Sequence, residues 1–318
     1  MQKVINDKFI KSNDEELFEI IGVQNESIDA LSTAPYSYWT EVFKTLAHNK
    51  GVWVCLFLFV VVIFFAIFGN NWCYYDPNQL LTNKYEAPSI EHWFGVGSKW
   101  DLWTVTWSGA RTSLILSVLV SLINIALGLI IGSVWGYFPK IDPIMIEIRN
   151  FFTNVPALLL NVMFMKLFLK ASVDAFWAVT FCLCFTGWLG LASTIRNQII
   201  IIRNRDFNIA SKTLGSKSVT MIIHNMLPQI IAVVVTLVAN SIPAAIDGEV
   251  SLSFFGLSVS NPIEPTLGYV INTGAKDSNW PTSPHIVMLP ALVTILITIT
   301  CYYIGFAIAD AADPRTHR

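Results

Sequence analysis

The sequence predicts an all-α polytopic membrane protein with six transmembrane helices. Of its 318 residues, 54% are hydrophobic and only 13% are charged, and the mean hydropathy is +0.56. A soluble domain carries about twice that share of charged residues. Apolar runs long enough to cross a bilayer core of about 30 Å as helices recur six times. The runs are 51–69, 112–137, 150–169, 174–200, 225–246 and 286–309.

The basic residues predict how these helices are oriented. Lys44 and Lys50 precede the first run, and five basic residues but only Asp206 lie around the connection between the fourth and fifth runs. Lysine and arginine are enriched in cytoplasmic loops. We therefore expect both termini in the cytoplasm and the segments 70–111 and 251–285 outside. The five basic residues are Arg196, Arg203, Arg205, Lys212 and Lys217.

The chain divides into four parts by composition. Residues 1–50 form a cytoplasmic N-terminal extension, 51–69 the first transmembrane helix, 70–111 an extracytoplasmic segment, and 112–318 a core with five transmembrane helices and a cytoplasmic loop at 203–224. The extension is polar and acidic, without the pattern of a secretory signal or a transit peptide. We expect a solvated cytoplasmic segment there, and a first membrane anchor that is retained.

Several classes of function are excluded. The 20 basic and 22 acidic residues nearly balance, which argues against a nucleic-acid partner. The five cysteines have no metal-ligand spacing, and neither a zinc-protease motif nor a nucleophile elbow occurs. No phosphate-binding loop is present, so this chain is not expected to hydrolyse ATP or to bind a cofactor. An ion-coupled secondary carrier is the alternative, although the ionisable residues expected near its midplane are missing.

The second run carries two helical stripes. Gly128, Gly132 and Gly136 recur every four residues, which predicts close approach of another helix backbone. A polar stripe runs along the same span, and the fifth run contains Asn240 and leads into Glu249 at its outer end. These side chains either bond to a neighbouring helix or line a solute path, and for Glu249 the alternative to a path or gate is an exposed helix end. The candidates for a translocation path are Ser117, Ser121, Asn124, Asn240 and Glu249.

The cytoplasmic stretch 206–228 is polar on average but periodic. Asp206 is suited to cap a helix, Phe207, Ala210 and Leu214 fall on one face, and Gly215 supplies a left-handed stop. A second apolar stripe follows, with Ser216 or Ser218 able to cap it. Two short helices with apolar stripes predict docking into a groove of a cytoplasmic partner, and the alternative is that they lie in the lipid interface. The second stripe consists of Val219, Ile222, Ile223 and Met226.

This stretch resembles the EAA coupling loop of importer permeases of the ATP-binding-cassette class. Four further segments are similar to the C-type permease subunit of oligopeptide and dipeptide importers: 92–95, 109–113, 249–257 and 310–315. Two departures stand out, because Ile209 occupies the place of the family's glutamate and Ser211 that of its second alanine. The loss of the glutamate removes half of a reciprocal capping box, worth about 1 kcal/mol. The residues matched to the coupling loop are Asp206, Phe207, Asn208, Ile209, Ala210, Ser211, Lys212, Thr213, Leu214 and Gly215.

The resemblance implies a type I importer permease fold in the cytoplasmic membrane. It implies a second, homologous permease subunit, two cytoplasmic ATPase subunits that bind ATP-Mg and dock on the coupling loops, and an extracytoplasmic peptide-binding protein. We expect the two outer segments to contact that receptor, since they contain tryptophans, which favour interfaces. Anchoring at the membrane boundary is the alternative role of these side chains. The tryptophans are Trp93, Trp100, Trp103 and Trp280.

Overall fold

The computed structural model describes residues 38–69, 81, 84–258 and 265–312. Residues 42–318 belong to one compact unit. Residues 1–37 of the expected N-terminal extension lie outside the described residues, and the rest of it contains the first helix in the list that follows. The helices are α2 (Tyr38–His48), α3 (Lys50–Phe68), α4 (Leu102–Tyr137), α5 (Asp142–Asn154), α6 (Ala157–Lys170), α7 (Ala175–Arg203), α8 (Asp206–Thr213), α9 (Ser218–Thr220), α10 (Ile231–Phe254), α11 (Leu267–Lys276) and α12 (His285–Ala312).

The described residues confirm the all-α prediction, since their only β-type pairing is an isolated bridge between Val96 and Asp101. Five helical stretches are long and apolar enough to cross a membrane. They correspond to the predicted first, second, fourth, fifth and sixth spans. These stretches are α3, α4, α7, the continuous run Ser218–Phe254, and α12.

The predicted third span, 150–169, is wrong as a single straight helix. The chain forms α5 and α6 instead, with an angle of 89° between them, and the pair makes a sixth span only if both helices are counted together. Pro156 explains the break. Proline has no N–H to donate and disfavours helical geometry in the residue before it, and Val155 is extended, with φ −97° and ψ 130°.

Helix α4 begins ten residues before the predicted start of the second span. Asp101 caps it, because its carboxylate accepts hydrogen bonds from the Thr104 backbone N–H (2.9 Å) and hydroxyl (2.8 Å). His92 Nδ1 lies 2.8 Å from the other oxygen of this carboxylate. The predicted extracytoplasmic segment 70–111 therefore ends in helix, and the preceding loop is fixed to the start of α4.

The predicted fifth span, 225–246, also starts too late. Helix begins at Ser218 and passes through a π-helical stretch, η2 (Met221–Met226), and a 3₁₀ stretch, η3 (Leu227–Ile230), before α10. Pro228 lies within η3, where its missing N–H is consistent with the irregular backbone.

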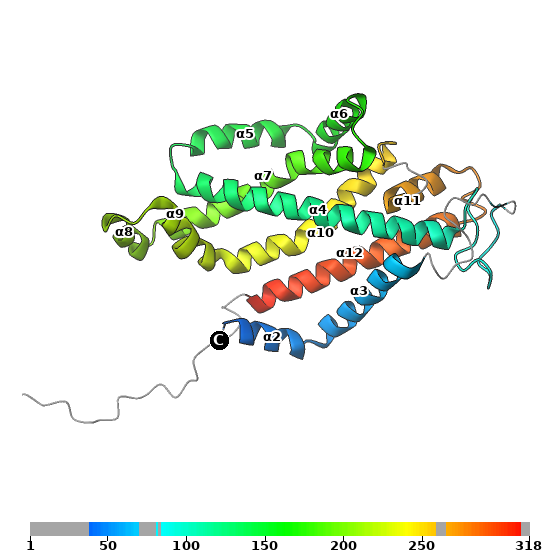
Figure 1. Ribbon diagram of the computed structural model, residues 1–318, viewed down its shortest axis with the longest axis horizontal. Helices are drawn as coiled ribbons and strands as arrows, with labels where there is room; N and C mark the ends of the chain where they lie inside the picture. The colour runs from blue at the N-terminus through cyan, green and yellow to red at the C-terminus, as the bar shows by residue number, and fades with distance from the viewer. Residues whose placement is uncertain (1–37, 70–80, 82–83, 259–264, 313–318) are drawn as a thin grey trace, which may run out of the picture. The chain divides into compact units, whose positions relative to one another are not determined.

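The glycine stripe is a close helix contact, as predicted. Helices α4 and α7 run side by side (Figure 1). A Cβ placed on Gly132 would lie 2.6 Å from the Ala192 carbonyl oxygen, and one on Gly128 or Gly136 would lie 2.7 Å from a Cβ of α7. These distances are shorter than van der Waals contact, so the backbones approach this closely only because three glycines lack side chains.

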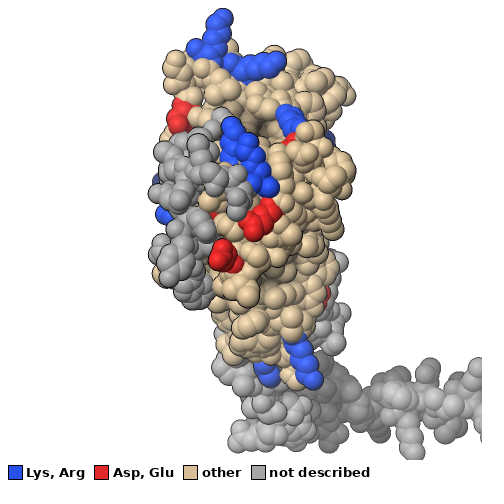
Figure 2. Space-filling view, turned by 90° about the vertical axis from the view of Figure 1, so that its right-hand side faces the viewer, with Lys and Arg blue, Asp and Glu red and all other residues tan. Residues whose placement is uncertain are grey.

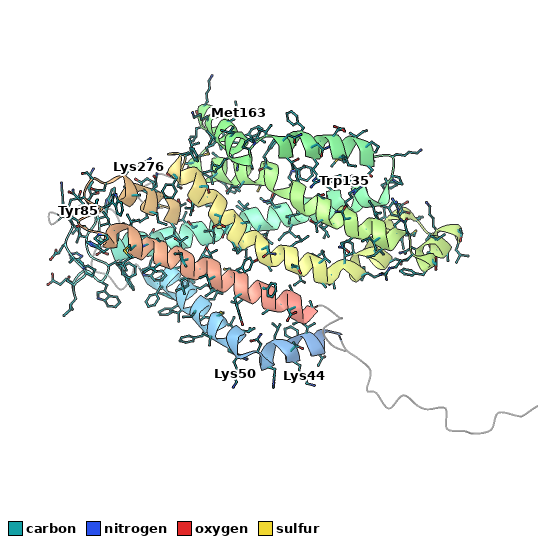
Figure 3. The ribbon with its side chains drawn as sticks, turned by 180° about the vertical axis from the view of Figure 1, so that it is seen from behind. Lys44, Lys50, Tyr85, Trp135, Met163 and Lys276 are labelled. Atoms are coloured by element: carbon teal, nitrogen blue, oxygen red, sulfur yellow. The ribbon has the colours of Figure 1, made fainter. Side chains whose placement is uncertain are left out.

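The bundle has two distinct ends. Helices α8 and α9 lie at one end, and α11 lies with the loop residues 84–101 at the other (Figure 1). Tyr85 and Lys276 both lie at the second end (Figure 3). Among the described residues on the face that Figure 2 draws, uncharged side chains predominate, and basic and acidic groups lie next to one another.

Candidate functional site

A buried asparagine holds α8 at its end of the bundle. Asn208 is 1% exposed, and its Nδ2 donates to the Ile202 carbonyl oxygen in the last turn of α7 (2.8 Å). Its Oδ1 accepts from Nδ2 of Asn225 in η2 (3.4 Å). One amide thus joins α7, α8 and the stretch that leads into α10. A movement of α8 would therefore be passed to two long helices.

The opposite surface of α8 is apolar and exposed. Phe207, Ile209 and Ala210 are exposed, and Leu214 just beyond the helix is 86% exposed. Phe207, Ala210 and Leu214 follow one another at spacings of three and four, whereas Ile209 lies on another side of the helix, and an exposed apolar surface at a helix end is suited to a partner. Phe207, Ala210 and Leu214 thus share an exposed surface, as their spacing predicts.

The caps and the second stripe differ from expectation. Asp206 is the first helical residue, follows the N-cap Arg205, and makes no capping bond. No side chain caps α9 either. The predicted second stripe is divided, because Ile222 and Met226 are buried whereas Val219 and Ile223 are exposed. The bend of the π-helical stretch changes the angular positions of these side chains.

Gly215 has a φ of +86°, which confirms the predicted left-handed turn. Replacing it with valine should weaken retention of a partner docked on α8 by about tenfold, because a β-branched residue at positive φ costs about 1–2 kcal/mol and redirects the helix. Nothing lies within 4 Å of an added Cβ, so steric collision is not the cause. Gly215→Asn is the matched control, since asparagine tolerates this φ. Equal loss in both variants of copurified partner would contradict the backbone explanation.

An ion pair fixes α5 to α7 near this end. The Arg196 guanidinium makes two hydrogen bonds to the Asp142 carboxylate (2.7 and 2.6 Å), and Trp135 Nε1 donates to the same carboxylate (2.7 Å). Arg203 Nη1 donates to the carbonyl oxygens of Gly136 and Tyr137 at the end of α4. Bidentate pairing gives a defined geometry as well as energy. These bonds connect α4, α5 and α7 above α8.

A cavity of about 330 Å³ lies between α4, α6, α7 and α10. Asn124 and Asn240, both predicted for a path, line it, and Asn161 of α6 joins them. Ser117 and Ser121 are buried but do not line it, and the Ser117 hydroxyl donates to the Leu114 carbonyl oxygen of its own helix (3.0 Å). The structure thus brings two of the five predicted path residues together. Asn161 was missed, although a lone asparagine inside an apolar run is itself a signal.

Glu249 lies elsewhere, in a hydrogen-bonded cluster towards α11. It is 1% exposed, so the interpretation as an exposed helix end is wrong. Its carboxylate accepts from the hydroxyls of Ser113 (3.2 Å) and Ser253 (2.9 Å). Ser113 Oγ in turn accepts from the Leu267 N–H at the start of α11 (2.9 Å). A Cβ on Gly268 would lie 2.7 Å from the carboxylate, so glycine permits this approach.

Removing the Ser113 hydroxyl should loosen α11. Ser113→Ala leaves the buried Leu267 N–H and one Glu249 oxygen without this partner, at about 1–3 kcal/mol for each group. We expect amide hydrogen exchange in the first turn of α11 to accelerate by about tenfold or more. Ser117→Ala is the matched control, because its hydroxyl bonds within α4. Exchange that accelerates equally in both variants would contradict the proposed link.

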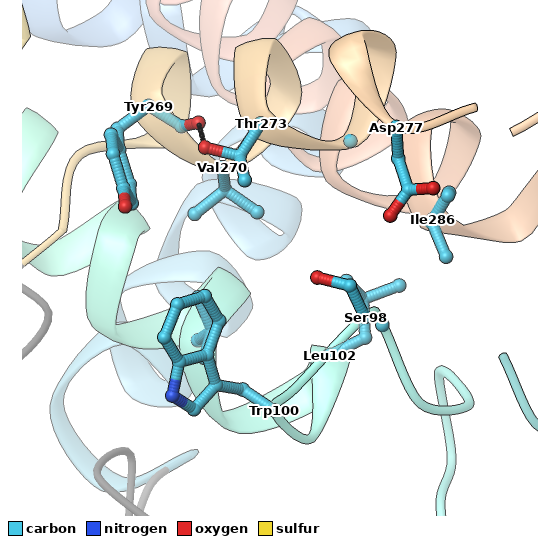
Figure 4. A pocket seen from close by; sticks show the side chains of 11 residues that line it. Ser98, Trp100, Leu102, Tyr269, Val270, Thr273, Asp277 and Ile286 are labelled. Atoms are coloured by element: carbon cyan, nitrogen blue, oxygen red, sulfur yellow. Dashed lines mark hydrogen bonds between the residues drawn. The ribbon is translucent and has the colours of Figure 1, made fainter. Parts of the chain in front are cut away.

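An aromatic slot opens beside α11, at the end of the bundle opposite α8. Figure 4 shows the Trp100 and Tyr269 rings beside a narrow apolar pocket of about 40 Å³, with Asp277 on its rim. Tyr85 Oη donates to the Asp277 carboxylate (2.9 Å), which ties the 84–101 loop to the end of α11. A wider hollow of about 350 Å³ adjoins it and includes Lys276.

The predicted receptor-facing tryptophans separate into two groups. Trp93 and Trp280 are exposed, and Trp100 lines the slot. Trp103 is buried, donates from Nε1 to the Gly69 carbonyl oxygen, and packs against Phe65. Its predicted role in receptor contact is wrong, because the early start of α4 places it in the core.

Comparisons with known proteins match almost the whole chain. Residues 124–318 match the family model described as the inner membrane component of binding-protein-dependent transport systems. Residues 37–88 match the N-terminal transmembrane domain of oligopeptide transport permease C. The chain is 32% identical to the oligopeptide transport system permease protein AmiD of Streptococcus pneumoniae, over 96% of this chain and 99% of that one. It is 31% identical to the dipeptide transport system permease protein DppC of Bacillus subtilis, over 96% and 94%.

Proposed function

This chain belongs to the family of inner membrane components of binding-protein-dependent transport systems, and from that premise we propose that it is a permease subunit of an ATP-driven peptide importer. The peptide substrate is proposed because AmiD and DppC, which match nearly full length, are permeases for oligopeptides and dipeptides. The family assignment removes the alternative of an ion-coupled carrier.

The observation that carries this proposal is the geometry of α8. Its exposed apolar surface offers a cytoplasmic ATPase a docking site, and Asn208 connects it to α7 and η2. An ATPase that moves α8 would thereby move two membrane helices as one lever. Alternating access needs two bundle packings of similar energy, biased by nucleotide on one side and by a loaded receptor on the other.

The proposed complex contains one copy of this chain, a homologous second permease, two ATPase subunits that bind ATP-Mg, and an extracytoplasmic peptide-binding protein. It lies in the cytoplasmic membrane, with both termini of this chain in the cytoplasm. The exposed Arg205, Lys212 and Lys217 around α8 support that orientation. The receptor docks at the end formed by α11 and residues 84–101, where exposed Trp93 and Trp280 favour a protein interface.

Purification of the chain with its partners in lipid nanodiscs tests the proposal. We expect two ATPase subunits to copurify and peptide-loaded receptor to stimulate ATP hydrolysis above the receptor-free rate. Stimulation by receptor loaded with another solute but not with peptide would overturn the peptide assignment. A chain that transports without a copurifying ATPase would overturn the whole proposal.

A further inference from the structure

We propose that Asn124, Asn161 and Asn240 form an uncharged binding site, the asparagine station, whose side chains form hydrogen bonds with the main chain of a peptide during transport. This inference rests on the proposed function, because it places a substrate contact in the cavity between α4, α6, α7 and α10. The ligand class assigned to the cavity is the peptide group. The consequence for specificity is that transport should not depend on the charge of the peptide's side chains.

Among the three asparagines, Asn124 gives the strongest support for a ligand in this cavity. The residue is 8% exposed, and its Oδ1 is buried without a hydrogen-bond partner in the described part of the chain. A buried amide oxygen left unpaired costs free energy, and rotation of this amide towards the cavity would let an occupant that donates a hydrogen bond pair with it. Gly187 faces this amide, and a Cβ there would collide with Nδ2 of Asn124. The glycine therefore leaves room for the side chain at the wall.

Asn161 and Asn240 complete the station from other helices. The Asn161 side chain is buried, and its Oδ1 accepts from the Thr186 hydroxyl (3.3 Å), which fixes its orientation. Asn240 of α10 and the neighbouring Ser241 lie on the same cavity. Three separate helices thus contribute one primary amide each to the same cavity. Helix formation in none of the three segments requires an asparagine at that position.

The chemistry of the lining selects the ligand class. Each asparagine amide has both a donor and an acceptor, as a peptide group does. None of the described residues that line the cavity is charged. A volume of about 330 Å³ lies within the range of small-ligand sites, roughly 300–1,000 Å³. Because peptide groups occur at every position of any peptide, this lining recognises the substrate without reading its charge.

Uptake of three tripeptides into proteoliposomes tests the proposal with the complete complex and its receptor. The probes are trialanine and its versions with a central lysine or a central aspartate. Asn124→Leu and Asn240→Leu should each slow uptake of all three peptides by a common factor of about ten. Asn124→Asp should lower the ratio of aspartate-peptide to lysine-peptide uptake by about tenfold or more, relative to the same ratio in the unmodified complex. Any preference of the peptide-binding receptor for one of the two peptides is the same in both complexes, so it cancels in this comparison.

Thr180→Val is the matched control, because Thr180 is buried in α7, bonds only to its own helix and does not line the cavity. It should change neither the rate nor the ratio. Leucine variants with undiminished uptake, or an aspartate variant that assembles and transports with an unchanged ratio, would identify the cavity as a packing gap and overturn the proposal. If Asn124→Leu fails to assemble, Asn240→Leu and the charge ratio decide. Failure of the unmodified complex to take up any of the three peptides would instead refute the proposed function.

Discussion

Replacement of Ala210 by aspartate should abolish both ATPase copurification and peptide uptake. Ala210 lies on the exposed surface of α8, between Phe207 and Leu214. If that surface fills a groove on the ATPase, docking buries the new carboxylate without a partner, at a cost of about 3 kcal/mol or more. A cost of that size weakens docking by at least about a hundredfold.

Ala171→Asp provides the matched control for this variant. Ala171 is also exposed, and it follows α6 outside the α8 surface. Both variants should reach the membrane at the level of the unmodified chain, because neither lies inside an apolar span. Normal uptake by Ala210→Asp would eliminate α8 as the docking element. Lost uptake with the ATPase still bound would place the fault in force transmission.

Replacement of Gly132 by leucine should prevent the chain from assembling into a stable complex. The first side-chain carbon alone would lie 2.6 Å from the Ala192 carbonyl oxygen and 2.9 Å from its Cα, and neither atom belongs to a flexible side chain. Helices α4 and α7 must then separate along the most extensive helix contact of the bundle. We expect a loss of about 3 kcal/mol, a large fraction of the roughly 5–15 kcal/mol by which a folded domain is stable.

The measurement is the yield of monodisperse complex after detergent extraction, together with its Tm. Gly190→Leu is the matched control, because Gly190 is an exposed glycine of α7 with no atom within 4 Å of an added Cβ. It introduces the same side chain into a span without a collision. Full yield and an unchanged Tm in Gly132→Leu would mean that the stripe is not a helix contact.

Features that depend on local chemistry could be predicted from the amino-acid sequence. Long apolar runs located five of the six spans, because a helix that crosses lipid needs about 20 apolar residues whatever its neighbours are. The spacing of Gly128, Gly132 and Gly136 predicted a close contact, and Gly215 predicted a left-handed turn. Both predictions follow from the absence of a Cβ, a property of the residue itself.

Contacts between residues that are distant in the sequence could be seen only in the folded chain. Asn161 joins Asn124 and Asn240 only because α6 turns sharply after Pro156 and packs beside α7. The buried Glu249 carboxylate is paired with Ser113, which lies 136 residues earlier in the chain. The position of Glu249 at the end of an apolar run did not indicate that partner. Likewise, the helical period alone did not show that Asn208 points inward, since a polar residue on a short polar helix is expected to face water. The physical reason is the same in all three cases. Hydrogen bonds between distant segments form only when the helices pack together, and they then outweigh the preference of a polar side chain for water.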